Sequence, residues 1–280
     1  MKKIIIFISA AMLILLVLLF AHIIYIDRFI PSEEYPEDVY LSSIQVKRAL
    51  VITAHDDDIC AMSGTISKLS KAGWQIKQLC FDTGDDARSD AHLKASKYIM
   101  EEASFIDLKN LSYRSINDSI QYSWMPLPKE IFPDIYQKEL IKKELIKSIN
   151  DFKPSVIFSL DDQIGGYGHP DHVFISDLVL EICREDKRSV LKIYQSVFPD
   201  SYEEALFPAL KNRASKYPSP YFTAKEMYNI DGMPEPSVQI DIYGNSLEKK
   251  LYLSSYLENE KRNIRKFLPY FEYYPHWFYF

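Results

Sequence analysis

The sequence predicts an α/β fold: a mostly parallel sheet with helices on both faces, preceded by an N-terminal transmembrane helix. Short, β-branched, continuously apolar runs at 49–54 and 155–160 are typical of strands that are buried on both faces. Helical spacing of apolar residues between such runs gives the alternation of strands and helices that is typical of a parallel sheet. At the N-terminus, residues 4–26 are apolar enough to cross a bilayer, which takes about 20 residues.

The N-terminal stretch predicts a membrane anchor. Residues 4–21 are all apolar or small, and residues 23–26 continue the run past His22. The apolar part of a signal peptide is shorter, about 7–15 residues, and no small-x-small cleavage pattern follows the run. We therefore expect residues 1–26 to be an uncleaved signal anchor, with a cleaved signal peptide as the alternative.

The charges around this stretch predict its orientation. Lys2 and Lys3 precede it, whereas the residues that follow are mainly acidic. Basic residues favour the cytoplasmic side, so we expect a single-pass membrane protein whose C-terminal domain lies on the extracytoplasmic side. Residues 27–46 predict a polar tether, and residues 47–280 a single domain.

The elements of this domain follow from periodicity and turn residues. Residues 49–54 predict the first strand, and apolar residues at helical spacing from Ile59 to Leu69 predict a helix that ends at Gly73. The remaining predictions are strands at 74–81, 155–160 and 191–198, and helices at 88–103, 134–151, 172–184 and 247–267. Residues 199–244, rich in Pro and Tyr, predict either an insertion or loops beside a substrate.

Composition excludes some functions. The chain has 33 Lys and Arg residues against 39 Asp and Glu residues, a formal charge of −6, which disfavours nucleic acid as a partner. Cys60, Cys80 and Cys183 are widely spaced and follow apolar neighbours, which is typical of core residues rather than of a disulfide framework.

Two polar clusters carry the chemistry. Residues 54–58 (Ala-His-Asp-Asp-Asp) directly follow the first strand, and residues 168–172 (Gly-His-Pro-Asp-His) follow the run at 155–160. In open α/β sheets, functional groups gather in loops beyond the carboxyl ends of the strands, so we expect the two clusters to meet.

Three of these residues predict a metal site. His55 and Asp58 lie on one tight loop, and His172 precedes Ile175 by three residues, so its ring should face inward. Two imidazoles and one carboxylate leave a coordination position open for water, as in catalytic zinc sites. The expected cofactor is Zn²⁺, although another divalent metal would also suit these ligands.

The neighbouring residues predict the catalytic groups. Asp57 is placed to act as general base. Because Pro170 disfavours a helical conformation at His169, that ring should point away from His172 and towards the substrate, where it could stabilise an oxyanion. Asp171 could hold one of the histidines through its second ring nitrogen.

Each cluster also has a purely structural interpretation. An Asp run at a helix start is often an N-cap, and His-Pro-Asp-His after glycines is often a turn that enters a helix. The occurrence of both clusters after buried strands favours the metal site. For His22, His92 and His276 we expect surface or interfacial positions.

The two clusters resemble the motifs of the PIG-L / LmbE-like family of zinc-dependent N-acetylglucosaminyl deacetylases. The first family motif, Ala-His-Pro-Asp-Asp-Glu, is similar to residues 54–59, and the second, His-Pro-Asp-His, is complete at residues 169–172. The resemblance spans roughly residues 47–200, with support from Thr83-Gly84 and from Arg88 near the family's substrate-side loop.

The resemblance implies a Rossmann-like fold without a dinucleotide and a role for each matching residue. It implies zinc ligands at His55, Asp58 and His172, a general base at Asp57, an oxyanion-stabilising or acid group at His169 tuned by Asp171, and substrate binding at Arg88. The chain departs from the family motif at two positions, with Asp56 in place of proline and Ile59 in place of glutamate.

The expected function is therefore removal of an acetyl group from an N-acetylglucosamine-containing glycan or glycoconjugate by zinc-activated water. The anchor favours a lipid-linked or envelope substrate. Two alternatives stay open: a catalytically weak, metal-containing glycan-binding protein, and an amidase or esterase that acts on a non-sugar acyl group.

Overall fold

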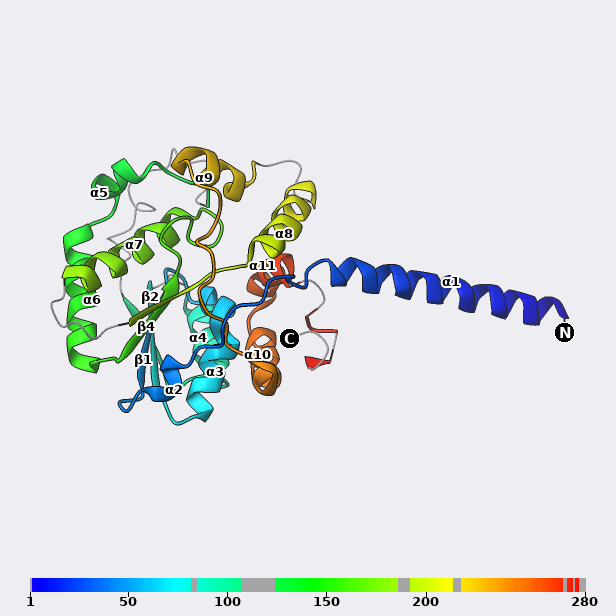
Figure 1. Cartoon of the computed structure of the whole chain (residues 1–280), viewed down its shortest axis with the longest axis horizontal. Coiled ribbons are helices and arrows are strands. Elements are labelled where there is room, and N and C mark those ends of the chain that lie inside the picture. The colour runs from blue at the N-terminus through cyan, green and yellow to red at the C-terminus, as the bar shows by residue number, and fades with distance from the viewer. Residues whose placement is uncertain are drawn as a thin grey trace.

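A five-stranded parallel sheet organises the part of the protein that the structure describes (Figure 1). This computed structural model describes residues 2–81, 85–106, 124–185, 192–213, 218–268, 271–273 and 275–276. The strands are β1 (Arg48–Ile52), β2 (Gln75–Phe81), β3 (Glu102–Ile106), β4 (Val156–Leu160) and β5 (Lys192–Ser196), in the order β3-β2-β1-β4-β5. All four pairings are parallel, which confirms the predicted fold class.

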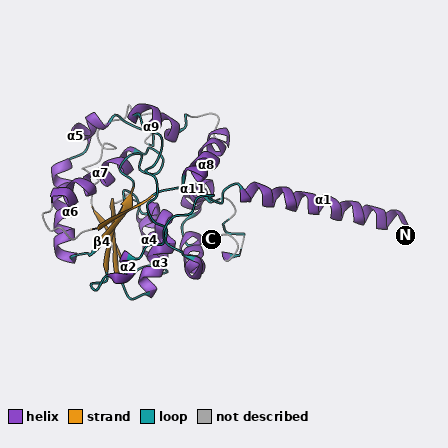
Figure 2. Cartoon of the chain, viewed as in Figure 1, coloured by secondary structure: helices purple, strands orange, loops and turns teal. Residues whose placement is uncertain are grey.

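Successive residues of β1 face opposite sides of the sheet. Because these residues are apolar on both sides, helices cover both faces of the sheet (Figure 2). Ala49 and Val51 pack in one core with α3 (Ser63–Lys71), α4 (Asp86–Ser96), α10 (Ser246–Ser254) and α11 (Glu258–Phe267). Leu50 and Ile52 pack in the other core with α6 (Lys138–Phe152) and α7 (Pro170–Glu185). Because both faces are buried, the strand reads as a continuous apolar run.

Residues 199–244, for which the sequence predicts either an insertion or loops beside a substrate, contain helices. They contain α8 (Asp200–Arg213) and α9 (Pro220–Tyr228), which share a small apolar cluster with Ile164 of the loop after β4. The remaining short elements are α2 (Tyr40–Ser43), α5 (Phe132–Ile135) and the 3-10 turns η1 (Asp57–Met62), η3 (Lys129–Ile131) and η4 (Tyr243–Asn245).

Three predicted helices were wrong in their extent. The helix predicted at 88–103 ends at Ser96, and its last residues belong to β3, which pairs with β2 as an edge strand. The helix predicted at 134–151 begins only at Lys138. The one predicted at 247–267 is α10 followed by α11, with a break that turns Tyr256 into the core.

The N-terminal residues include one helix that is long and apolar enough to cross a membrane, α1 (Lys2–Asp27), which projects from the domain (Figure 1). A signal sequence would meet the same criteria of length and composition. The segment after it, predicted as a tether, lies against the domain. The Phe29 ring is 6.3 Å from that of Tyr202, and the Ser201 amide donates to Glu33 (2.8 Å).

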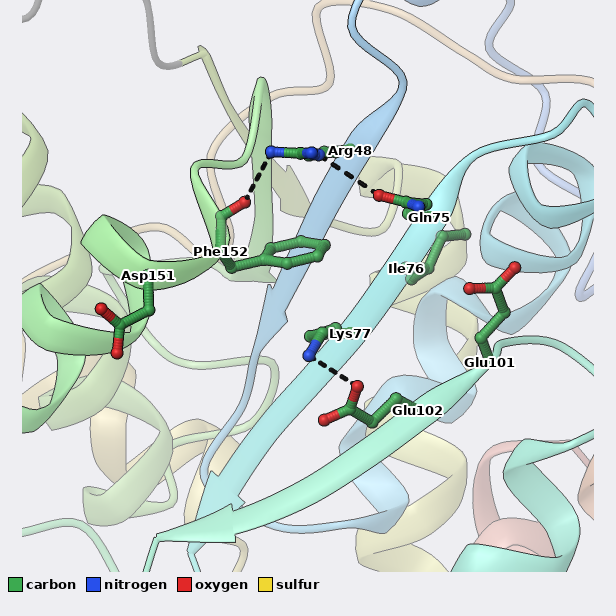
Figure 3. A pocket seen from close by; sticks show the side chains of 8 residues that line it. All are labelled: Arg48, Gln75, Ile76, Lys77, Glu101, Glu102, Asp151 and Phe152. Atoms are coloured by element: carbon green, nitrogen blue, oxygen red, sulfur yellow. Dashed lines mark hydrogen bonds and ion pairs between the residues drawn. The ribbon is translucent and has the colours of Figure 1, made fainter.

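A polar hollow of about 330 Å³ lies at the amino ends of β1 and β2 (Figure 3). Its cationic side chains are engaged by their neighbours. Arg48 donates to Gln75 (3.2 Å) and to the Phe152 carbonyl (3.3 Å), and Lys77 pairs with Glu102 (2.6 Å). The hollow lies away from both polar clusters of the sequence.

Candidate active site

The two polar clusters meet between the carboxyl ends of β1 and β4, where the strand order reverses. His55 and Asp58 come from the loop after β1, and His172 from the first turn of α7. His55 Nδ1 lies 2.9 Å from His172 Nε2, and Asp58 Oδ1 lies 3.1 Å from the same nitrogen. The second Asp58 oxygen lies 3.7 Å from His55 Nδ1. The structure thus brings the three predicted metal ligands together at the switch point of the sheet.

These three donors fit a divalent cation. Two ligands that each lie 2.0–2.1 Å from one tetrahedral zinc are about 3.3 Å apart, close to the separations found here. Burial alone would lower the pKa of His55, but the Asp58 and Asp171 carboxylates raise it to about 10. The same negative charges that hold a proton on this ring would favour a metal in its place.

The ring of His172 is oriented by the glycine-rich loop. Its Nδ1 lies 2.8 Å from the Gly165 carbonyl oxygen, which directs Nε2 towards the other donors. Gly165 has a φ of +58°, and a Cβ there would lie 2.5 Å from the Cβ of His172. Asp161, which is fully buried, accepts four backbone N–H groups of this loop. The Asp161 side chain is a supporting residue that sequence reasoning missed.

The second nitrogen of His55 is held by Asp171. His55 Nε2 lies 3.1 Å from Asp171 Oδ2, and Tyr136 donates its hydroxyl to Asp171 Oδ1 (2.6 Å). Such partners orient a ligating imidazole and make it more basic. Tyr136 is also a residue that sequence reasoning missed, because it lay inside a predicted helix and far from both motifs.

The predicted direction of the His169 ring was wrong. His169 is indeed non-helical, but it is the N-cap of α7: its carbonyl accepts from His172 and Val173, and its Nδ1 accepts from the Asp171 amide (3.2 Å). This cap stacks the ring on His172, with centroids 4.7 Å apart, instead of turning it away. Because Nδ1 accepts a hydrogen bond, the proton of the neutral ring lies on Nε2.

Asp57 lies beside the donors and is bound by Arg88. The Arg88 guanidinium donates to Asp57 Oδ1 (2.9 Å) and, through Nε, to Asp56 Oδ1 (2.8 Å). Burial raises the pKa of Asp57, as do Asp56 and Asp58, whereas Arg88 lowers it. Arg88, expected to bind substrate, is thus in contact with carboxylates of the first motif.

His55, His169 and His172 form one group of donors whose ligand atoms all lie within 4.8 Å, and His55, Asp57 and Asp58 form another. Every residue predicted for the metal or for catalysis therefore lies at one place. Thr83 and Gly84, which supported the family resemblance, lie outside the described residues.

A buried polar network supports the backbone of the first motif. Gln78 Oε1 can only accept, so His92 donates from Nε2 to it (2.8 Å), and His92 Nδ1 lies 2.8 Å from the Tyr256 hydroxyl. That hydroxyl lies 3.0 Å from the Asp56 carbonyl oxygen. His92 is fully buried, so its predicted surface position was wrong; His22 and His276 are half-buried. The helical pattern around residue 92 gave no sign of this network.

The burial of His92 predicts a pH-dependent stability. Burial lowers the pKa of this ring to about 4, from about 6.5 in an unfolded chain. Between these values the unfolded chain binds more protons, so stability is complete above pH 6.5 and falls towards pH 4. The loss should approach about 3 kcal/mol. Denaturant unfolding of the full chain in detergent at several pH values should show a shallower pH dependence for His92→Gln; identical slopes would contradict the assignment.

Comparison with known proteins relates the region of this site to a known family. Residues 50–183, just under half of the chain, match the family model described as PIG-L: GlcNAc-PI de-N-acetylase. Through these residues the chain is similar to the PIG-L family. The match contains every residue predicted for the metal or for catalysis.

One curated relative is the diacetylchitobiose deacetylase of Thermococcus kodakarensis, which is 29% identical over 133 residues. The match covers 45% of this chain and 45% of the relative, so the chain spans about half the length of that curated relative.

Two solved structures are similar to this chain at low sequence identity. The N,N'-diacetylchitobiose deacetylase from Pyrococcus horikoshii, in complex with its inhibitor, has a TM-score of 0.44 at 16% identity and covers 81% of this chain and 79% of its own. GalB, a 4-carboxy-2-hydroxymuconate hydratase of a Pseudomonas, has a TM-score of 0.36 at 15% identity. The match covers 65% of this chain and 83% of GalB. Both likenesses concern the fold alone.

Proposed function

We propose that this protein is a metal-dependent hydrolase that removes the acetyl group of an N-acetylated amino sugar, with zinc as the metal. The observation that carries the proposal is the approach of His55, Asp58 and His172 within 2.9–3.7 Å, with Asp57 and His169 beside them. A bound divalent cation would polarise the acetamide carbonyl and lower the pKa of a water.

The protein's own groups would handle the protons. Asp57 takes a proton from the attacking water and later delivers it to the departing nitrogen. His169 donates its Nε2 proton in a hydrogen bond to the carbonyl oxygen as negative charge develops there. A bond forms between the water oxygen and the carbonyl carbon, the C–N bond breaks, and acetate and the free amine are the products.

The substrate we propose is an N-acetylglucosamine-containing glycan or glycoconjugate. The family description names GlcNAc-PI, and the curated relative is a diacetylchitobiose deacetylase. If α1 is an uncleaved anchor, the domain lies close to the membrane, because Phe29 already packs on Tyr202 two residues after the helix ends at Asp27. This proximity favours a lipid-linked or envelope glycan.

We also propose that the domain lies on the extracytoplasmic side, as Lys2 and Lys3 at the start of α1 favour. In sealed, right-side-out vesicles, added protease should digest the domain and leave a small membrane-bound fragment. A domain that survives intact, and is digested only after the membrane is opened, would contradict this orientation.

An acetate-release screen tests the function. The full chain in detergent, with its metal content measured, would be incubated with free and lipid-linked N-acetylated amino sugars, non-sugar N-acetyl amines and acetyl esters. We expect equal amounts of acetate and amine from an amino sugar. Release of acetate from esters or non-sugar amides alone would favour an amidase or esterase that acts on a non-sugar acyl group. Glycan binding without release of acetate would favour a catalytically weak glycan-binding protein.

A further inference from the structure

The Asp56 side chain is buried at a position where the family motif has proline. Its carboxylate is 0% exposed, and one of its oxygens, Oδ2, has no hydrogen-bond partner among the residues that the structure describes. A buried ion pair with an unsatisfied oxygen generally costs free energy compared with an apolar group of similar size. The carboxylate is therefore poorly explained by a contribution to folding.

The backbone does not require Asp at this position. Asp56 has a φ of −63°, which is within the range that proline imposes. The turn after β1 could thus be built with the proline of the family motif. What the aspartate adds to this chain is its carboxylate.

That carboxylate binds Arg88 of α4. Asp56 Oδ1 accepts from Arg88 Nε at 2.8 Å and also from Nη2. Nη2 in turn donates to Asp57 Oδ1 at 2.9 Å, and Nη1 lies 3.9 Å from Glu260 of α11. The guanidinium is planar and rigid, so binding at Nε and Nη2 determines where Nη2 meets Asp57.

We propose that Asp56 is a positioning residue, whose buried carboxylate fixes the Arg88 guanidinium so that Arg88 holds the Asp57 carboxylate in one orientation beside the candidate metal ligands. This inference rests on the proposed function, because Asp57 is the proposed base. Asp56 acts on Asp57 through Arg88 rather than on the substrate, and Glu260 adds a longer ion pair at Nη1.

Kinetics of Asp56 variants test the proposal. With the amino sugar found in the acetate-release screen, Asp56→Pro and Asp56→Ala should lower kcat by about 10- to 100-fold, the usual cost of losing an outer partner, with KM unchanged. Asp56→Asn keeps the shape of the side chain and one acceptor oxygen. Its kcat should lie between those of these two variants and that of the original protein. Asp90→Ala removes an exposed carboxylate from α4, the helix that carries Arg88. This variant is the matched control and should retain full activity.

A double-mutant cycle distinguishes positioning from a general disturbance of the fold. In an Arg88→Ala background, Asp56→Ala should have no further effect on kcat, because its route to Asp57 is gone. An equal loss in both backgrounds would overturn the proposal. A fully active Asp56→Pro variant would also overturn it, since the position would then serve only the turn.

A measurement independent of turnover separates this inference from the proposed function. Phenylglyoxal modification of Arg88 in the metal-free full chain, followed by peptide mass spectrometry, should be faster in Asp56→Asn than in the original protein, with Arg48 at the far end of the sheet unchanged. Equal rates at Arg88 would overturn the proposal even if the enzyme deacetylates sugars. Faster modification in a protein that releases no acetate would support the Asp56–Arg88 contact and refute the hydrolase instead.

Discussion

His172→Ala is expected to abolish stoichiometric zinc binding and to lower acetate release by more than about 100-fold. Loss of an outer partner of a metal ligand costs about 10- to 100-fold, and loss of a direct donor should cost more. His172 is one of three donors that converge, and its Nδ1 is already bound to Gly165. A water could not replace its oriented nitrogen.

The measurement is metal content by mass spectrometry, together with acetate release from the amino sugar found in the screen. His276→Ala, a histidine that lies 2.8 Å from the Ser246 hydroxyl of α10, is the control and should keep both metal and activity. Chelation of the original protein should reproduce the loss, and added Zn²⁺ should reverse it. A His172→Ala variant with full metal content would contradict the ligand assignment.

Asp57→Asn should lower kcat by about 10²- to 10⁴-fold while leaving the metal bound, which is the range for loss of a general base. Asparagine keeps the shape of aspartate and an oxygen that can accept from Arg88, but it cannot take the proton of the attacking water. The variant thus removes the proposed chemical role with little change in packing.

Metal content decides between two roles for Asp57, because His55, Asp57 and Asp58 lie close enough to bind one ion. Loss of zinc from Asp57→Asn would make Asp57 a ligand rather than the base. Asp177→Asn, an exposed carboxylate on α7, is the matched control and should change neither metal content nor kcat.

The sheet could be predicted because burial on both faces leaves a local signature. Each of β1 and β4 is an apolar run of adjacent residues, so strand, loop and helix alternate visibly along the chain. The edge strand β3 has no such signature, since Glu102 and Ser104 interrupt it, and it was taken for the end of a helix. Edge strands are less buried, and their sequences are correspondingly less distinctive.

The candidate ligands could be predicted for a similar reason. His55 and Asp58 follow β1, and His172 lies at the start of the helix that follows β4, and parallel strands bring their carboxyl ends to one edge. The orientation of His169 could not be predicted, because it depends on a hydrogen bond to the amide of Asp171. Local sequence indicated a non-helical residue but not the direction of its ring.

The α/β class, the positions of the two polar clusters and the residue types that suit a metal can be predicted from sequence alone, because each depends on a short segment of the chain. Which side chains hold those residues in place depends instead on tertiary packing. Tyr136 binds Asp171, Tyr256 reaches the backbone of Asp56, and Arg88 joins Asp56 to Asp57. These partners are up to 200 residues apart in the chain. Their contacts arise from the packing of α5, α4 and the α10–α11 turn around the sheet, and no local pattern encodes them.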